Sequence, residues 1–422
     1  MFYQVASFGD KMANSFIQHE SMKHTSFAKR LNMLNATSNL TFESAAAASL
    51  ALQPDAPLFC FSATQLRERA LDFLKGFPGE TTFAVKANSS PQVIKVLAEA
   101  GINAWDVASV HEMAMVSKIV SMARFHYHNP VKSRREISDA YKIYKCQRYV
   151  VDCREELAKI ADIVGPAKNI EIAVRFVLPR ERGSSAHDFS TKFGAPDHIC
   201  VELLKQVVAL GYTPLLTFHP GSQCTEPRNY VRHIEAAARI AKTASVTISK
   251  LNVGGGFPAN YVLSTAPEPQ VFFKAIEKSV LKAFGKENRP ALECEPGRGL
   301  VATCMSLLTR VKLVCTDGDD IFINDGVYGG LMEYMQVPEL EPPFRVIRDG
   351  KVIEGDAKSF KVFGPTCDPL DVLPHRLDIL ATLREDDYIE FGSLGAYGLA
   401  TMTNFNGYGG NAIVAVDQAF AL

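Results

Sequence analysis

The sequence predicts an α/β protein in which a (β/α)8 barrel precedes a C-terminal domain of mostly antiparallel β-strands. Between residues 58 and 300, short apolar runs alternate eight times with longer amphipathic stretches. Strands that alternate with helices pair in parallel through right-handed crossovers, and eight such units in about 240 residues have the size of a closed barrel. After Val301 the runs are short, alternating and β-branched, with no long helical pattern between them, which is typical of antiparallel strands.

Each expected barrel strand is a short apolar run that ends in a polar or glycine-containing turn. The eight runs span 81–88, 104–109, 124–129, 148–152, 170–176, 214–223, 250–256 and 291–298. The strands expected after the barrel span 307–315, 320–325, 344–353, 360–365, 387–391 and 412–416, while the run 58–62 could belong to either part. We therefore expect an N-terminal extension of residues 1–54 without assigned structure, a barrel of residues 55–303 and a β domain of residues 304–422.

The composition excludes several classes of protein. The 422 residues carry 45 basic and 46 acidic side chains, a net charge of −1, whereas a protein that binds a nucleic-acid backbone needs a basic surface. Apolar residues make up 47% of the chain, too many for a disordered protein, yet no run of about 18 apolar residues predicts a membrane span. We expect neither a nucleic acid nor a membrane as a partner.

The cysteines favour a reducing compartment. Their number, nine, is odd, and no two are spaced as Cys-x-x-Cys. A disulfide framework or a zinc site is therefore not expected. The first 25 residues contain charged side chains and no apolar core of the kind found in secretory signals. We expect a cytoplasmic protein without a bound metal.

Reactive side chains stand at the carboxyl ends of the expected barrel strands, where barrel enzymes place their active sites. They are Lys86, Asp106, His219, Ser222, Gly254–Gly256, Glu295 and Arg298. Lys86 ends an apolar run, and a lysine there is costly to bury unless it is paired or neutral. It could be a Schiff-base lysine whose amine is deprotonated by burial, or a lysine that snorkels from the barrel rim or pairs with Asp106.

Three strand ends offer groups that bind anions. Gly254, Gly255 and Gly256 follow an apolar strand, so their backbone amides could form a phosphate nest, although tight turns use glycines as readily. Ser222 adds a hydroxyl, and the dipeptide Gly297–Arg298 adds an amide and a guanidinium. Donors on three neighbouring loops suit one phosphate better than three unrelated turns do.

Glu295 and His219 each have a structural and a functional explanation. As a structural residue Glu295 would need a cation, and Arg298 is one candidate. As a functional residue it would hold the proton on a pyridine nitrogen, which makes the ring an electron sink. His219 could be a rim histidine with satisfied hydrogen bonds, or it could lie flat against an aromatic cofactor.

The C-terminal part carries three further candidates. Cys367 and Asp368 lie in the turn FGPTCDPLDVL. A lone cysteine is most often an inert buried one, but a cysteine beside an aspartate in an exposed-looking turn is harder to explain by packing. Tyr397 lies in the glycine-rich stretch GAYGLATMTNFNGY, which is typical of backbone close to a ligand.

Eight motifs in order give the chain a family resemblance. They are AVKAN, WDVAS-x-x-E, HPGSQ, GGGFP, ECEPGR, DGVYGG, GPTCD and GAYG…FNGY, and the match as a whole runs from about residue 58 to residue 408. Together they resemble the fold type III pyridoxal-phosphate decarboxylases of basic amino acids, the ornithine, lysine and arginine group, whose barrel is like that of alanine racemase. The resemblance therefore implies an alanine racemase-like barrel and pyridoxal 5'-phosphate as the cofactor.

The resemblance also implies a role for each motif residue. Lys86 would hold the cofactor covalently, His219 would stack on the pyridine face and Glu295 would pair with the ring nitrogen. The residues that would support the ring are Asp106, Glu112 and Arg175, and those that would bind the phosphate are Ser222, Gly254, Gly255, Gly256, Gly297, Arg298 and Tyr397.

The implied reaction is decarboxylation of a basic L-amino acid in polyamine biosynthesis. Ornithine, giving putrescine, comes first among the substrates, followed by lysine, giving cadaverine, and arginine. Cys367 would return a proton to Cα from a partner subunit, so the active unit would be a homodimer with shared sites. Asp368 offers a carboxylate to the distal cation of the substrate, and Tyr328 matches a position near the substrate tail.

One departure leaves the substrate open. Eukaryotic-type ornithine enzymes carry a Tyr-Asp pair beyond the DGVYGG motif, whereas this chain continues as GGLMEYMQVPEL, which looks more like the bacterial enzymes. Glu333 is the nearest acid there, and we expect it to bind substrate. One methylene is worth only about 1–3 kcal/mol in a pocket, so ornithine and lysine are not separated by sequence.

Three alternatives remain beside this prediction. Diaminopimelate decarboxylases carry Glu-Ser after the cysteine, where this chain has Asp368. Racemases on the same barrel place an arginine against the ring nitrogen, where this chain has Glu295. A catalytically inactive regulatory homologue should have lost the lysine, the cysteine or the phosphate ligands, and this chain keeps all of them.

Overall fold

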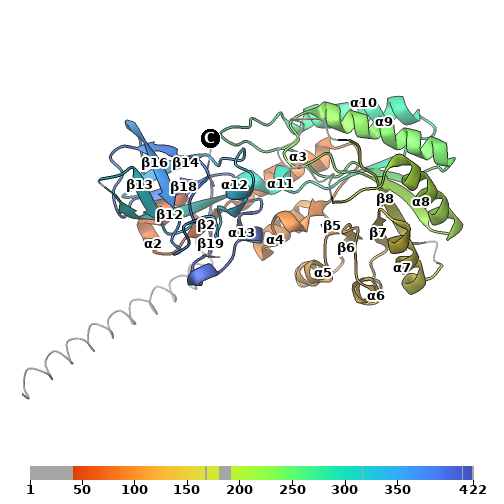
Figure 1. Ribbon diagram of the computed structural model, residues 1–422, viewed down its shortest axis with the longest axis horizontal. Coiled ribbons are helices and arrows are strands. Elements are labelled where there is room, and N and C mark those ends of the chain that lie inside the picture. Colours follow the sequence, from red (N-terminus) through yellow and green to blue (C-terminus); the bar gives the residue numbers. More distant parts are fainter. Residues whose placement is uncertain (1–40, 167–168, 180–191, 316, 411, 421–422) are drawn as a thin grey trace, which may run out of the picture.

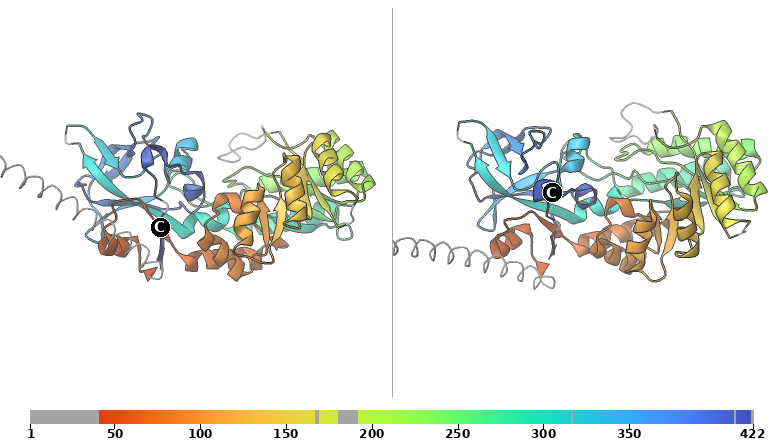
Figure 2. Two further views of the ribbon diagram at one scale, coloured as in Figure 1. Left: turned by 90° about the horizontal axis from the view of Figure 1, so that it is seen from below. Right: turned by 60° about the horizontal axis from the view of Figure 1, so that its bottom comes forward.

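The computed structural model describes residues 41–166, 169–179, 192–315, 317–410 and 412–420. Its strands form two sheets, which lie at opposite ends of the elongated molecule in all views (Figures 1 and 2). One is a nearly closed ring of parallel strands with helices around it, and the other is mostly antiparallel. The predicted fold class, a parallel barrel followed by a β domain, is therefore confirmed.

All eight expected barrel strands are present, and the first of them is divided. The strands are β3 (Glu80–Thr81), β4 (Phe83–Ala84), β5 (Ala104–Val107), β6 (Arg124–Tyr127), β7 (Arg148–Val151), β8 (Glu171–Arg175), β9 (Thr213–Thr217), β10 (Lys250–Asn252) and β11 (Ala291–Cys294). Their order is β3-β11-β10-β9-β8-β7-β6-β5-β4. Only Thr82 separates β3 from β4, so the divided strand joins both ends of this order and closes the ring.

Helices between the strands bury one face against the ring. They are α3 (Ala63–Gly76), α4 (Pro91–Ala100), α5 (Val110–Ser117), α6 (Arg134–Lys142), α7 (Arg154–Val164), α8 (Asp197–Ala209), α9 (Pro227–Ala244) and α10 (Pro269–Phe284). In α9, for example, Tyr230, Ile234 and Ala237 recur at helical spacing and are buried. Among the described residues, no helix has the length and apolar composition needed to cross a membrane.

The second sheet takes strands from both ends of the chain. It contains β1 (Thr41–Phe42), β2 (Leu58–Phe61), β12 (Met305–Val314), β13 (Asp320–Ile323), β14 (Phe344–Arg348), β15 (Lys351–Ile353), β16 (Ala357–Phe363), β17 (Leu377–Leu380), β18 (Tyr388–Phe391) and β19 (Ile413–Val416). The run 58–62 therefore belongs mainly here, because β2 pairs with β12 and β19. The sequence pattern did not reveal β17. Helix α2 (Ala45–Leu52) packs beside β2, β14 and β19.

Short helical turns lie between the strands of both parts, and some of them carry contacts between the two parts. They are the 3-10 turns η2 (Val85–Ala87), η3 (Ala302–Cys304) and η4 (Phe405–Gly407), and the helices α11 (Arg298–Val301), α12 (Met332–Gln336) and α13 (Gly398–Thr401). The amide of Tyr397 donates to the Ala87 carbonyl, 2.8 Å away, and the Asn88 side chain donates to Gly395. The second part is thus held against the barrel rim that carries the candidate residues.

Candidate active site

A pocket at the carboxyl ends of the barrel strands brings together five of the predicted residues, which are Lys86, Asp106, Arg175, His219 and Glu295. Lys86 follows β4 in the turn η2, and its side chain is exposed to this pocket. The charged or polar side chains around it come from β5, β6, β8, β9 and β11; they are Asp106, His128, Arg175, Thr217, His219 and Glu295. Because all these strands are parallel, residues far apart in the sequence meet at one rim.

The Lys86 amine is not neutralised by its surroundings. Loss of water around the amine lowers its pKa, but the phenol of Tyr397 and the carboxylates of Asp106 and Glu295 outweigh this, so the pKa of Lys86 is raised. The expectation of a buried, deprotonated amine was therefore wrong for the protein in this state. The alternative prediction, a lysine stabilised by Asp106, describes its electrostatic surroundings better. Lys86 must lose a proton before it can attack a carbonyl.

Two buried carboxylates and one histidine form the floor of the pocket. Burial and the nearby Glu295 raise the pKa of Asp106 to about 7. Glu295 is buried as well, but the adjacent His128 and Lys86 lower its pKa to about 2. His128 Nδ1 makes a short hydrogen bond to Glu295 Oε1 and lies 3.7 Å from Asp106 Oδ1. Asp106 is thus the carboxylate that can exchange a proton near neutral pH, while Glu295 stays ionised.

His219, Arg175 and Glu112 lie around this floor. His219 is neutral, because burial and the cations Lys86 and Arg175 lower its pKa well below the usual range, and its Nδ1 accepts a hydrogen bond from the Gly221 amide at 3.1 Å. Burial also lowers the pKa of Arg175. Glu112 accepts a hydrogen bond at 2.6 Å from the Ala108 amide, so its carboxylate stabilises the start of α5.

The three predicted anion-binding loops do meet. Arg298 donates from Nε and Nη2 to the Ser222 hydroxyl, both at 3.3 Å, and its guanidinium lies 5.1 Å from the Tyr397 ring centre. Gly254 has a positive φ of 71°, and a Cβ there would lie 2.2 Å from the Phe218 carbonyl oxygen. A Cβ on Gly255 would lie 2.7 Å from the Glu295 carbonyl oxygen. Glycines are therefore required where the β9, β10 and β11 loops converge.

The backbone amides of the glycine loop at 254–256 differ in whether they already have an acceptor. The Gly254 amide donates to the Asn252 side chain at 2.8 Å, so it is already committed inside the protein. Within the described chain, no partner accepts from the amides of Gly255 and Gly256. Gly297 lies against the barrel, where a Cβ would come within 2.9 Å of Ala87 Cβ. Gly255 and Gly256 are thus better placed than Gly254 to donate to an anion.

Glu333 lies against Arg298. From α12 it forms a two-point ion pair with the guanidinium, one hydrogen bond of which measures 2.8 Å. Arg298 Nη1 also donates to the Tyr261 hydroxyl at 2.6 Å. Burial disfavours the guanidinium charge, but Tyr261 and Glu333 more than compensate, so the pKa of Arg298 is raised. The expected contact of Glu333 with substrate stays a prediction, and its contacts are on the anion side of the site.

The predicted residues of the β domain form a second group. Tyr328 donates to Asp368 Oδ2 at 2.6 Å, and this hydrogen bond lowers the pKa of Asp368. Cys367 is exposed, and its amide and thiol donate to Asn406 Oδ1 at 3.2 and 3.3 Å. The described residues that line the Lys86 pocket all come from the barrel, so this group is not part of it within one chain.

Sequence reasoning missed His128, Asn252 and Asn406. His128 directly follows β6 and Asn252 is the last residue of β10, and a place at the end of a strand is the criterion that selected Lys86 and His219. Applied to every strand, that criterion finds both. Asn406 has no such signal, because its contact with Cys367 depends on how two loops of the β domain fold together.

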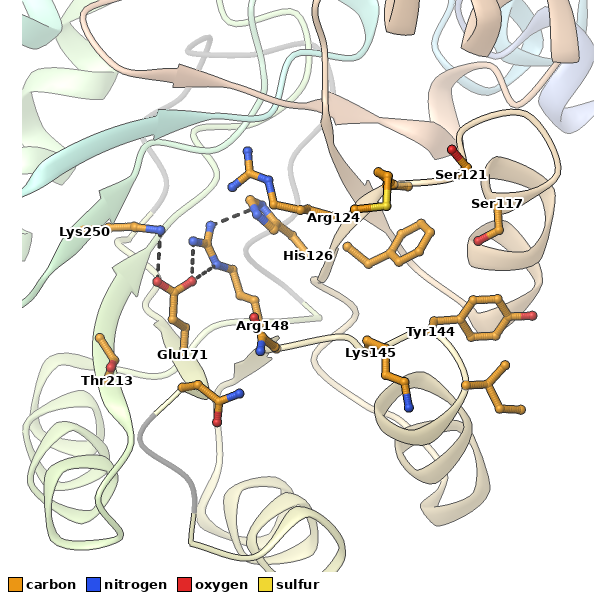
Figure 3. A pocket seen from close by; sticks show the side chains of 16 residues that line it. Ser117, Ser121, Arg124, His126, Tyr144, Lys145, Arg148, Glu171, Thr213 and Lys250 are labelled. Atoms are coloured by element: carbon orange, nitrogen blue, oxygen red, sulfur yellow. Dashed lines mark hydrogen bonds and ion pairs between the residues drawn. The ribbon is translucent and has the colours of Figure 1, made fainter.

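A different hollow, of about 710 Å³, opens at the amino-terminal ends of the barrel strands (Figure 3). Two of its cations are paired with one carboxylate: Arg148 Nε donates to Glu171 at 2.7 Å, and Lys250 Nζ lies 2.9 Å from Glu171 (Figure 3). Arg148 also contacts His126 and the buried Glu293. Because these cations are already paired, we assign this end of the barrel to stability.

Two groups of side chains lie close enough to share a metal ion, with ligand atoms within 4.8 Å of one another. They are Glu80, His126 and Glu293 at the amino-terminal end, and Asp106, His128 and Glu295 in the pocket. His126 has a pKa well below the usual range because of burial and Arg148, whose Nη1 meets its Nδ1 at 3.1 Å. A neutral ring that accepts at Nδ1 carries its proton on Nε2, which leaves no lone pair for a metal.

Comparison with known proteins gives these residues a family context. Residues 63–302 match the family model described as pyridoxal-dependent decarboxylase, pyridoxal binding domain. Antizyme inhibitor 2 of Xenopus laevis is 31% identical over 362 residues, covering 80% of this chain and 76% of that protein. Lysine/ornithine decarboxylase of Selenomonas ruminantium is 30% identical over 334 residues, covering 77% and 80%.

The similarity extends to solved structures. A crystal structure of SrLDC in complex with PLP and cadaverine superposes with a TM-score of 0.75 at 26% identity, covering 87% of this chain and 92% of that chain. Both the barrel and the second sheet therefore fall within the shared fold.

Proposed function

Because the chain belongs to the fold type III pyridoxal-dependent decarboxylases, the family of the ornithine, lysine and arginine decarboxylases, we propose that it removes the α-carboxylate of a basic L-amino acid. We take L-ornithine, giving putrescine, as the first substrate and L-lysine, giving cadaverine, as the second. The observation that carries the proposal is the convergence of Lys86, Glu295 and the Arg298–Ser222 pair on one rim of the barrel.

The cofactor of this family is pyridoxal phosphate, and the residues present fit it. The Lys86 amine faces the pocket and can react with the aldehyde. Ser222, Arg298 and the free amides of Gly255 and Gly256 offer donors to the phosphate. Three of the remaining predicted contacts line the same pocket; they are Asp106, Arg175 and His219. The others belong to elements that follow the barrel strands or pack on their carboxyl ends; they are Glu112, Gly254, Gly297 and Tyr397.

The chain's own groups supply the proton transfers. When bound, pyridoxal phosphate supplies an electron sink for the electron pair that remains when CO2 leaves. Tyr397, Asp106 and Glu295 favour the protonated form of Lys86, so the proton that Lys86 loses on reacting has to leave against their attraction. Glu295 stays ionised, so its carboxylate would stabilise a proton on the ring nitrogen of a bound cofactor. His219 is neutral, so it would pack against the ring of a bound cofactor without adding a charge.

Protonation at the substrate Cα belongs to Cys367 of a partner subunit. The thiol is exposed and lies outside the barrel pocket of its own chain, and Asn406 orients it. A homodimer that places each Cys367 over the other chain's Lys86 completes two shared sites. This arrangement explains why an exposed cysteine lies in an ordered turn.

Asp368 and Tyr328 favour a substrate with a distal cation. Asp368 remains ionised because Tyr328 donates to it, and a carboxylate beside Cys367 suits an ammonium or guanidinium group. Diaminopimelate, with a second carboxylate at that end, would meet repulsion there. Arginine remains the third candidate after ornithine and lysine.

A second candidate function is a non-catalytic one. It is favoured by one observation, the 31% identity to a protein named antizyme inhibitor 2. Retention of Lys86, Cys367 and the phosphate-binding groups favours the enzyme over this candidate.

The two candidates are separated by CO2 release from the four labelled amino acids ornithine, lysine, arginine and diaminopimelate. We expect the purified protein, saturated with pyridoxal phosphate, to release CO2 fastest from ornithine, and Lys86→Ala to release none. Fastest release from lysine or arginine would correct the substrate within the family. Release only from diaminopimelate, or from none of the four, would overturn the proposal.

A further inference from the structure

His128 contacts both carboxylates of the pocket floor. It follows β6, and its backbone amide donates to the Val107 carbonyl on the neighbouring strand at 3.1 Å, which holds this residue beside β5. The side chain is only 7% exposed, and its partners Asp106 and Glu295 are 9% and 10% exposed. A hydrogen bond between groups so well shielded from water is strong, and losing one partner leaves a buried charge uncompensated.

The hydrogen bonds to Glu295 all converge on one of its oxygens. His128 Nδ1 and Asn252 Nδ2, the latter at 2.5 Å, both bond to Oε1. Asn252 is itself held by the Gly254 amide. Oε2 receives no hydrogen bond from any residue that the structure describes. Glu295 is therefore anchored through one oxygen on the protein side while the other remains available in the pocket.

The second nitrogen of His128 also lacks a partner. Nε2 is buried and makes no hydrogen bond among the described residues, although His128 lines the pocket. A histidine with a purely structural role in a core normally satisfies both nitrogens. The charged or titratable groups that face the ring are Asp106 on β5, His126 on β6, Arg148 on β7 and Glu295 after β11. Of this set, the carboxylates of Glu295 and Asp106 both lie within 4.0 Å of His128 Nδ1.

We propose that His128 is a positioning residue, which donates from Nδ1 to Glu295 Oε1 and thereby orients Oε2 toward the ring nitrogen of the cofactor. The imidazole also provides compensating positive charge between two carboxylates that would otherwise repel each other. The effect of the two carboxylates agrees with this, since Glu295 and Asp106 raise the pKa of His128 against the opposing effect of burial. The inference uses the cofactor of the proposed function, but it does not depend on which amino acid is the substrate.

Two isosteric variants separate this role from a general packing role. The amide of His128→Asn can occupy the position of Nδ1, so it can still donate to Glu295 without carrying a charge. The amide of His128→Gln reaches the position of Nε2 and leaves Oε1 without its donor. Both replace an aromatic ring by an uncharged amide, so each serves as the control for the other.

The readouts are the dissociation constant for pyridoxal phosphate, measured by titrating apoprotein, and the ¹⁵N chemical shift of cofactor labelled at the ring nitrogen. Loss of a hydrogen bond to a charged group predicts about tenfold to hundredfold weaker cofactor binding for His128→Gln. Its ¹⁵N signal should move toward that of an unprotonated pyridine. His128→Asn keeps the donor to Oε1 but not the positive charge, so it should bind the cofactor more tightly than His128→Gln and keep the wild-type ¹⁵N shift.

Equal affinities and shifts in the wild type and His128→Gln would overturn the proposal. Thermal unfolding of all three proteins reports folding separately, and a merely structural role would lower the melting temperature of both variants while leaving the ¹⁵N shift unchanged. Neither readout requires turnover. If the wild type binds the cofactor but releases no CO2 from the four amino acids, the proposed function fails while the role of His128 is still decided.

Discussion

The ion pair between Arg298 and Glu333 gives a prediction that distinguishes two roles for Glu333. The Arg298 side chain is 4% exposed and that of Glu333 is 14% exposed, so the pair is largely shielded from water. In the protein without cofactor, Glu333 balances the guanidinium charge. A bound phosphate would take over that balance, and Glu333 would then lie close to a second anion. We therefore expect Glu333→Gln to destabilise the cofactor-free protein more than the loaded one.

The size of the effect follows from the geometry. Removing one partner of a buried ion pair costs about 3–5 kcal/mol, and Gln keeps one hydrogen bond to the guanidinium, so about 3 kcal/mol is expected. If bound phosphate restores all of it, the cofactor should bind about 100-fold more tightly to the variant. The control is Tyr261→Phe, which removes a neutral acceptor 2.6 Å from the same guanidinium. It should change cofactor affinity by less than about tenfold and should not improve it.

The assay is titration of apoprotein with pyridoxal phosphate, accompanied by thermal unfolding with and without cofactor. Unchanged or weaker cofactor binding by Glu333→Gln would refute the reasoning. A raised KM for the amino acid at unchanged cofactor affinity would instead support Glu333 as a substrate ligand, the role first expected from the sequence.

Three further outcomes are expected. Mixing inactive Lys86→Ala with inactive Cys367→Ala subunits should restore about a quarter of the activity, because one of the two shared sites in each mixed dimer is intact and half of randomly mixed dimers are mixed; no restoration in dimers shown to be mixed would place both residues in one chain's site. Asp106 has a folded pKa raised above that of the unfolded chain, so its carboxylate destabilises the cofactor-free protein progressively as the pH rises from about 4 to about 7. Asp106→Asn should accordingly gain stability relative to wild type between pH 5 and pH 7.5 in urea unfolding, and a pH-independent difference would contradict this cause. Tyr328→Phe removes the hydrogen bond that orients Asp368 and should lower kcat/KM for ornithine by about threefold to tenfold at unchanged cofactor affinity; unchanged steady-state kinetics would show that this bond does not matter for substrate binding.

The sequence alone determined the fold class and most of the rim. Alternation of apolar runs and amphipathic stretches is a local property, so all eight barrel strands could be located from it. Lys86, His219 and Glu295 could be selected because each follows such a run, and the carboxyl ends of parallel strands meet at one rim whatever the details of packing. The division of the first strand around Thr82 could not be foreseen, because it arises only when the ring closes.

The tertiary structure decided which of these groups touch and what charge they carry. His128 and Glu295 are 167 positions apart, and Glu333 reaches Arg298 from a different part of the fold, so neither contact follows from local periodicity. The raised pKa of Lys86 is the balance between loss of water and three acidic groups brought in by β5, β11 and the β domain. Strand positions are encoded by neighbours in the chain, whereas electrostatic balance in a pocket depends on every element that closes around it.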